Sequence, residues 1–239
     1  MKIQLLIALS CFYAPTEVMA RTLDYDSLVK VSRSYCESGK ADKALGALDR
    51  AIKRAPNRPD AYVVQGFAFA LKKEFTESIA AYEKGRALGS TDRRLFVELA
   101  TLYDAQEQYK KATGVHRAWL TIQPNDQEVR HELGLTLILA GDLPNAIIEL
   151  KNVVKALPKK GEPKRDLAYA YASGGHHELA FPLVEQAFPT SMPLPVLMDF
   201  IQTYSDPDLA LGFFNRFARR PFDPAHQRIE AHLKKLTAP

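Results

Sequence analysis

A set of small residues recurs every 34 positions along most of this 239-residue chain. Its members are Ala44, Ser78, Ala112, Ala146 and Ala180. A second small set with the same spacing is Ser32, Gly66, Ala100, Gly134 and Ala168. A mostly aromatic set is Tyr35, Phe69, Tyr103, Leu137 and Tyr171, and a weaker set is Pro56, Ser90, Pro124 and Pro158. One period shared by four sets indicates an internal repeat, which constrains the fold before any single residue is considered.

Each repeat unit has the pattern of two amphipathic helices joined by a short turn. In the first unit, apolar and small side chains recur at helical spacing from Leu28 to Tyr35. Gly39 ends this helix, because a residue without Cβ adopts the left-handed conformation at low cost. The pattern predicts a second helix over 41–54, which Pro56 terminates because proline cannot continue a helix.

The residues of this unit match a known family. The order Leu28, Val31, Ser32, Tyr35, Ala44, Leu48, Ala51 and Pro56 resembles the tetratricopeptide repeat. Four further units, starting near residues 59, 93, 127 and 161, carry the same pattern. The resemblance implies an all-α fold, a right-handed α-solenoid of about five helix–turn–helix repeats over residues 21–189. One such hairpin cannot bury its own apolar face, so its stacked neighbours must cover it.

Some positions depart from the family pattern. His116 stands at an aromatic position, and Trp119 replaces a small residue, so we expect Trp119 to turn outward or to spread the third and fourth units. Arg130 and Lys164 occupy the first signature position of units four and five, where we expect weaker contacts.

The period breaks after Pro189. Residues 190–239 are interpreted as a degenerate sixth repeat followed by a capping helix. Two further helices are expected over 196–204 and 207–218, and a last helix over about 224–236. A cap is needed because an open end of a solenoid exposes core side chains.

Residues 1–20 have the pattern of a secretory signal peptide. Lys2 precedes an apolar run that is too short to span a bilayer, and small residues precede a cleavage site after Ala20. The alternatives are a bacterial lipoprotein signal with Cys11 as the lipidated residue, or an apolar N-terminal helix that is retained. Cleavage after Ala20 would leave Cys36 as the sole cysteine, which we interpret as a small buried side chain.

Composition and motifs favour a binding protein over an enzyme. The 32 basic and 28 acidic residues are well mixed, and the net charge of +4 does not by itself indicate nucleic-acid binding. The sequence has no phosphate-binding loop, nucleophile elbow or zinc-protease helix. His176 and His177 are adjacent in a turn and are expected to point apart. We therefore expect no catalytic, cofactor or metal site.

The family resemblance implies which surface binds a partner. In such arrays the first helix of each unit lines a concave groove. Carried over by repeat position, the expected protein-binding residues are Val29, Arg33, Val63, Phe67, Leu71, Val97, Asp104, His131, Leu135, Ile138, Leu139, Arg165 and Tyr169. The stretch 133–140 is apolar at nearly every position, so either a partner segment or the C-terminal helices of the same chain should cover it. The Lys/Asn/Arg clamp by which some family members hold a C-terminal carboxylate is absent.

The resulting functional hypothesis is a non-catalytic scaffold for protein–protein interaction. We expect a protein exported to the bacterial periplasm that holds an apolar or amphipathic segment of another protein during assembly of a pilus, secretion or exopolysaccharide machine. An outer-membrane lipoprotein is a variant of this hypothesis, and a membrane partner is expected only in that case. The alternative is a cytosolic regulator or an accessory subunit of an enzyme complex.

Overall fold

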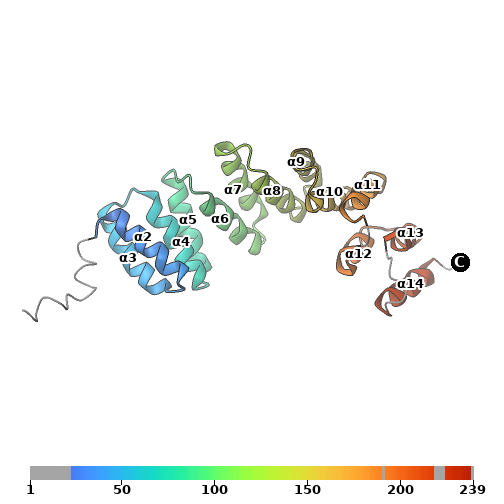
Figure 1. The fold of residues 1–239 in the computed structure, drawn as a ribbon, viewed down its shortest axis with the longest axis horizontal. Helices are drawn as coiled ribbons and strands as arrows, with labels where there is room; N and C mark the ends of the chain where they lie inside the picture. Colours follow the sequence, from blue (N-terminus) through green and yellow to red (C-terminus); the bar gives the residue numbers. More distant parts are fainter. Residues whose placement is uncertain (1–22, 190–191, 218–223, 238–239) are drawn as a thin grey trace, which may run out of the picture. The chain divides into compact units, whose positions relative to one another are not determined.

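The computed structural model describes residues 23–189, 192–217 and 224–237, which form 13 α-helices and no strand (Figure 1). The predicted signal peptide lies outside the described residues. The helices are α2 (Tyr25–Glu37), α3 (Ala41–Arg54), α4 (Pro59–Leu71), α5 (Phe75–Ala87), α6 (Arg93–Ala105), α7 (Tyr109–Ile122), α8 (Gln127–Leu139), α9 (Leu143–Ala156), α10 (Gly161–Ser173), α11 (His177–Ala187), α12 (Leu194–Ile201), α13 (Pro207–Phe217) and α14 (Pro224–Leu236). This is the all-α repeat solenoid that the 34-residue period predicts.

The chain forms two compact units, residues 1–107 and residues 108–239. In the first unit, α2 packs against α3 and α4 packs against α5, and the first helices α2, α4 and α6 are neighbours in that order. In the second unit, α8 and α9 form one hairpin, α10 and α11 form the next, and α8 contacts α10. We call the surface made by neighbouring first helices the first-helix face of each unit.

The helix starts and ends follow from local sequence. Asp24 and Asp126 cap α2 and α8, since their carboxylates accept backbone N–H bonds from Ser27 and Val129. A left-handed residue recurs at 34-residue spacing between the two helices of each of the five regular repeats: Gly39, Lys73, Glu107, Gly141 and Gly175. Lys73 and Glu107 take φ values of 62° and 57° although each carries a Cβ, so the repeat imposes this turn even where glycine is absent.

The two sets of small residues lie where the helices of a hairpin cross. The hydroxyl of Ser78 in α5 donates to the carbonyl of Gly66 in α4 at 2.8 Å, which places the two backbones in close approach. A Cβ on Gly66 would lie 2.6 Å from the fully buried ring of Tyr82, and one on Gly134 would lie 2.7 Å from the side chain of Leu150. These glycines are therefore required by packing, as the repeat pattern predicts.

At the departures from the pattern, the structure excludes one of the two outcomes expected for Trp119 and gives Arg130 polar contacts. Trp119 does not turn outward: its side chain is buried, and Nε1 donates to the Asp126 carboxylate at 2.8 Å. Arg130 also makes strong contacts in place of the missing apolar ones. Its guanidinium donates to Glu149 of α9 at 2.8 Å and to the carbonyl of Pro124 at 2.6 Å. An ion pair thus joins α8 to α9 where the first three units have Leu28, Tyr62 and Phe96.

The helices after the fifth repeat continue the core of the second unit. Side chains of α12 (Leu197, Phe200) and α13 (Phe213) are buried in one cluster with Ala168 of α10 and Val184 of α11. Leu233 of α14 is buried in the same cluster. The phenyl rings of Phe200 and Phe213 stack with their centroids 5.5 Å apart. Apolar packing therefore extends from the last regular repeat into the irregular C-terminal part.

A glycine comparison tests the close helix crossing. Gly66→Ala should lower the free energy of unfolding by about 1 to 3 kcal/mol, because the new methyl group overlaps the Tyr82 ring. Gly46→Ala is the matched control, since Gly46 lies inside α3 with no atom near its Cβ position. It should stabilise the protein by up to about 1 kcal/mol through higher helix propensity. Urea unfolding followed by circular dichroism measures the free energy of unfolding of both variants. Equal stability of the two variants would contradict a close approach of the helices at Gly66.

The buried imidazole of His116 predicts a pH dependence of stability. Burial lowers the pKa of His116 to about 4, whereas its ordinary value is 6.5. Between pH 6.5 and 4 the unfolded chain takes up a proton that the folded chain does not. The free energy of unfolding should therefore fall by about 3 kcal/mol across this window through His116 alone. His116→Phe should remove this part of the pH dependence in thermal unfolding scans, and an unchanged profile would contradict it.

Candidate functional site

The first-helix face of the first unit carries three of the expected residues, Arg33, Phe67 and Leu71, together with Arg94. Phe67 of α4 is half-buried, and the guanidinium of Arg94 of α6 lies 4.7 Å from the centroid of its ring. Arg33 of α2 forms an ion pair of 3.6 Å with Asp92, the N-cap of α6. Leu71, one helical turn beyond Phe67, is 42% exposed. An apolar strip on α4 is thus flanked by two arginines, one of which is already paired.

Other expected residues of this unit contribute less surface. Val29 and Val63 are buried in the core, so their side chains are part of the packing. Val97 and Asp104 of α6 are half-buried. The open surface of this face is therefore narrower than the repeat positions alone suggest.

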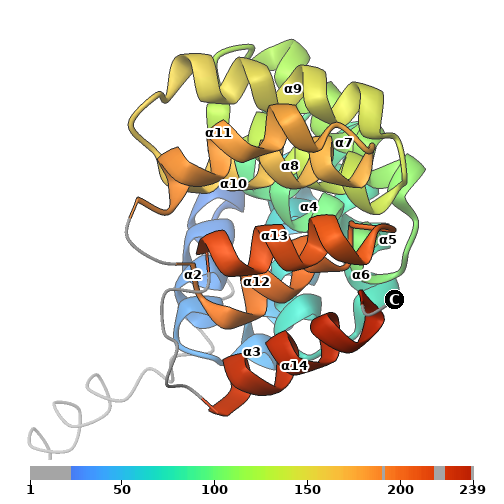
Figure 2. The ribbon, with the colours of Figure 1, turned by 90° about the vertical axis from the view of Figure 1, so that its right-hand side faces the viewer.

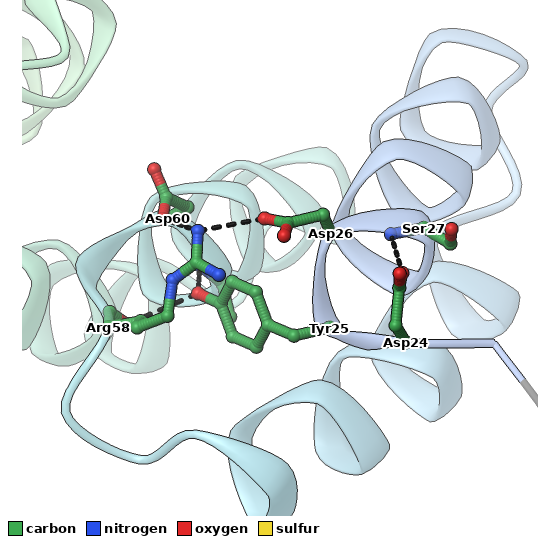
Figure 3. Close-up of polar contacts among 7 residues, drawn as sticks. Asp24, Tyr25, Asp26, Ser27, Arg58 and Asp60 are labelled. Carbon is green, nitrogen blue, oxygen red and sulfur yellow. Dashed lines mark hydrogen bonds and ion pairs between the residues drawn. The ribbon is translucent and has the colours of Figure 1, made fainter.

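A polar cluster borders the first-helix face where α2 meets the start of α4 (Figure 3). The guanidinium of Arg58 lies 4.0 Å from the centroid of the Tyr25 ring and contacts the carboxylates of Asp26 at 2.8 Å and Asp60 at 3.3 Å. The Tyr25 hydroxyl donates to the carbonyl of Arg58 and accepts from the backbone N–H of Ala61. These contacts tie the first repeat to the second and neutralise part of the acidic border.

The second unit places apolar side chains along α8. Leu135 and Leu139 lie one turn apart on the same side of the helix, and Ile138 packs against the cores on both sides of α8. Leu139 is 59% exposed, the highest value among the large apolar side chains that the structure describes. Part of the apolar surface of α8 is thus buried by packing, and part stays exposed at the C-terminal end of the helix.

Next to this strip, a polar network links α8 to α10. His131 Nε2 lies 2.7 Å from Asp166 Oδ2, and Arg165 Nε donates to Asp166 Oδ1 at 2.7 Å. Burial acts to raise the pKa of Asp166, but the hydrogen bonds from His131 and Arg165 outweigh it and hold that pKa below its ordinary value. Asp166 therefore remains a carboxylate at neutral pH and fixes the directions of both partner side chains.

An open pocket of about 430 Å³ lies beside this network, lined by Arg165, Asp166, Tyr169, Val196, Asp199 and Phe200. The edge of the Tyr169 ring packs on Phe200 of α12, with centroids 5.8 Å apart. Helix α12 thus borders the first-helix face at Tyr169, while Leu139 of α8 keeps its exposure. The pocket combines an aromatic wall with charges of both signs.

Sequence reasoning missed several of these participants. Arg94 occupies one of the groove positions of its repeat, whereas Asp166 occupies none of them, so the repeat pattern gives no signal for Asp166. Val196, Asp199 and Phe200 lie beyond the regular repeats. Only the fold places these side chains beside the expected ones.

A cluster of potential metal ligands and a helix able to cross a membrane are both absent from the described residues. Residues 23–189, 192–217 and 224–237 contain no group of three His, Cys, Asp or Glu side chains that could hold a metal ion. His176 lies edge-on to Tyr171, whereas His177 stacks on Tyr204, so the two imidazoles have different partners. In the same part of the chain, every helix is too short or too polar to cross a bilayer.

Comparisons with known proteins agree with this architecture. The model of the tetratricopeptide repeat family matches residues 32–93. No curated protein sequence matches the chain. Among solved structures, the chain is similar to YrrB, described as a tetratricopeptide repeat protein with an unusual peptide-binding site, with a TM-score of 0.61 and 22% identity over 84% of this chain and 97% of YrrB.

The chain is also similar to MamA. For MamA of Desulfovibrio magneticus RS-1 the TM-score is 0.60 at 18% identity, over 69% of this chain and 93% of that chain. For MamA of MSR-1 the TM-score is 0.58 at 21% identity, over 69% of this chain and 95% of that chain. At such low identity the likeness shows the fold, an array of helical repeats.

Proposed function

We propose, from the premise that this chain is a tetratricopeptide repeat protein, that it is a non-catalytic scaffold whose first-helix faces bind an apolar or amphipathic segment of another protein. Repeat arrays of this kind serve protein–protein interaction, and the solved relative YrrB is described with a peptide-binding site. The observation that carries the proposal is the pair of exposed leucines, Leu71 and Leu139, at the ends of α4 and α8.

The surroundings of these leucines suit an amphipathic segment. Leu71 and Leu139 each lie one turn beyond a half-buried apolar side chain, Phe67 and Leu135, which gives each unit a short apolar strip. Each strip is bordered by polar groups: Arg33 and Arg94 in the first unit, and the His131–Asp166–Arg165 network in the second. A segment with one apolar side and one polar side would satisfy both features, in the manner of helix-in-groove recognition.

Substitution of the two strips tests this role. Phe67→Glu combined with Leu139→Glu should abolish capture of the partner, because two charges would face an apolar ligand surface. The matched control is Phe75→Glu with Ile148→Glu, which changes exposed apolar residues of the second helices α5 and α9 (47% and 56% exposed). The wild-type chain and both variants serve as bait in an envelope extract, with helicity checked by circular dichroism. If both double variants lose capture equally, or if neither loses it, the hypothesis that the first-helix faces bind the partner is rejected.

We further propose that the protein acts in the bacterial periplasm, in the assembly of an envelope machine. The support is that residues 1–20 have the pattern of a signal peptide and that the repeats begin only after this segment. Lipidation at Cys11 would instead anchor it to the outer membrane, and a retained N-terminus would favour the cytosolic regulator.

Mass spectrometry of the protein from cell fractions distinguishes these outcomes. The proposal expects a mature chain that begins at Arg21 in the periplasmic fraction. A chain that begins at a lipidated Cys11 would indicate the lipoprotein. An intact chain from Met1 in the cytoplasmic fraction would contradict export.

A further inference from the structure

A second cavity lies between α12, α13 and α14, in the part of the chain that departs from the 34-residue period. It measures about 490 Å³, within the size range of small-molecule pockets. Figure 2 shows these three helices in orange to red, with α13 packed against both α12 and α14. None of the expected partner-binding residues lines this cavity, so it is independent of the first-helix face.

The walls of the cavity are mainly apolar. Ile201 of α12, Ala210 of α13 and Leu233 of α14 are buried side chains that line it. Met198 and Ile229 add half-buried apolar surface, and Leu236, which also lines the cavity, is 55% exposed. An exposed leucine on the wall of an open apolar cavity indicates surface that a ligand would cover.

The one formally charged residue among those that line the cavity, Arg228, is basic. Arg228 and His232 lie one turn apart on α14 and both line it, whereas none of its eleven lining residues is acidic. The nearby acid Glu230 is paired with Lys234, and Asp206 caps α13. The cavity therefore complements a ligand with an apolar body and a negatively charged head.

The cavity wall has few other polar groups, and this favours an acyl chain over a peptide as the ligand. A peptide backbone placed inside would bring N–H and C=O groups that need partners, and burying them unpaired is costly. Apart from Arg228 and His232, the wall offers only the side chains of Ser205 and Tyr204. The ring of Tyr204 is held in place by stacking on His177, with centroids 4.0 Å apart. An acyl chain has no such groups to satisfy.

We propose that this cavity binds one free long-chain carboxylate, with its acyl chain between α12, α13 and α14 and its head at Arg228 and His232. Burial of each additional methylene should strengthen binding about fourfold until the cavity is full. The head group adds a charge-assisted contact that a neutral alcohol of the same length lacks.

Isothermal titration of the full chain tests the site with decanoate, dodecanoate and dodecanol below their aggregation limits. We expect one saturable site, about 16-fold tighter binding of dodecanoate than of decanoate, and several-fold weaker binding of dodecanol. Arg228→Gln with His232→Gln should reduce dodecanoate binding to the level of dodecanol and leave dodecanol binding unchanged. Equal effects of this double variant on both ligands would reject the assigned head-group site.

A filling variant tests the acyl-chain site. Ile229→Trp places a large ring on a half-buried wall position and should weaken dodecanoate binding at least about tenfold. Leu209→Trp is the matched control, because Leu209 is an exposed side chain of α13 that does not line the cavity. The proposal is overturned if Ile229→Trp binds as the wild type does, or if no saturable binding occurs up to about 1 mM. Binding to anionic phospholipid vesicles without binding of monomeric dodecanoate would also overturn it, in favour of a membrane surface.

Discussion

The fold depends on the close crossing of the two helices within a repeat, as α2 with α3, α4 with α5, α8 with α9 and α10 with α11. At the crossing, a glycine, alanine or serine leaves room for the partner helix, as where Gly66 faces the ring of Tyr82 and Gly134 faces Leu150. In the first hairpin the Ser32 hydroxyl donates to the carbonyls of Leu28 and Ala44, so its polar group is satisfied without space for water. A larger residue at such a crossing would push the hairpin open and separate the apolar surfaces beside it.

Because this crossing recurs every 34 residues, it also fixes the direction of the first helices. The contacts of α2 with α4 and of α4 with α6, and those of α8 with α10, place equivalent positions side by side within each unit. This alignment sets Arg94 of α6 over Phe67 of α4 and brings His131 of α8 to Asp166 of α10. The candidate binding surface is thus a product of the repeat geometry, with local charges added at positions that vary between repeats.

Where residues depart from the repeat pattern, other contacts replace the usual ones. Arg130 replaces an apolar contact with an ion pair to Glu149, and Trp119 is buried because its indole nitrogen finds an acceptor in Asp126. After the fifth repeat, aromatic packing around Phe200 and Phe213 takes over from small-residue crossings. The shorter helices of this region pack less regularly, and a cavity lies between α12, α13 and α14.

The sequence by itself determined the fold class, the bounds of α3 and the residues at the crossings. Those features rest on local periodicity and on side-chain size, as the agreement of α3 with its expected range shows. The tertiary structure decided which groove positions remain open: Val29 and Val63 are buried in the core, whereas Leu71 and Leu139 stay exposed. It also decided that Asp166 pairs with a histidine 35 residues away and that α12–α14 enclose a cavity. Such juxtapositions depend on how whole helices pack, and a repeat period carries no information about side chains that differ from one repeat to the next.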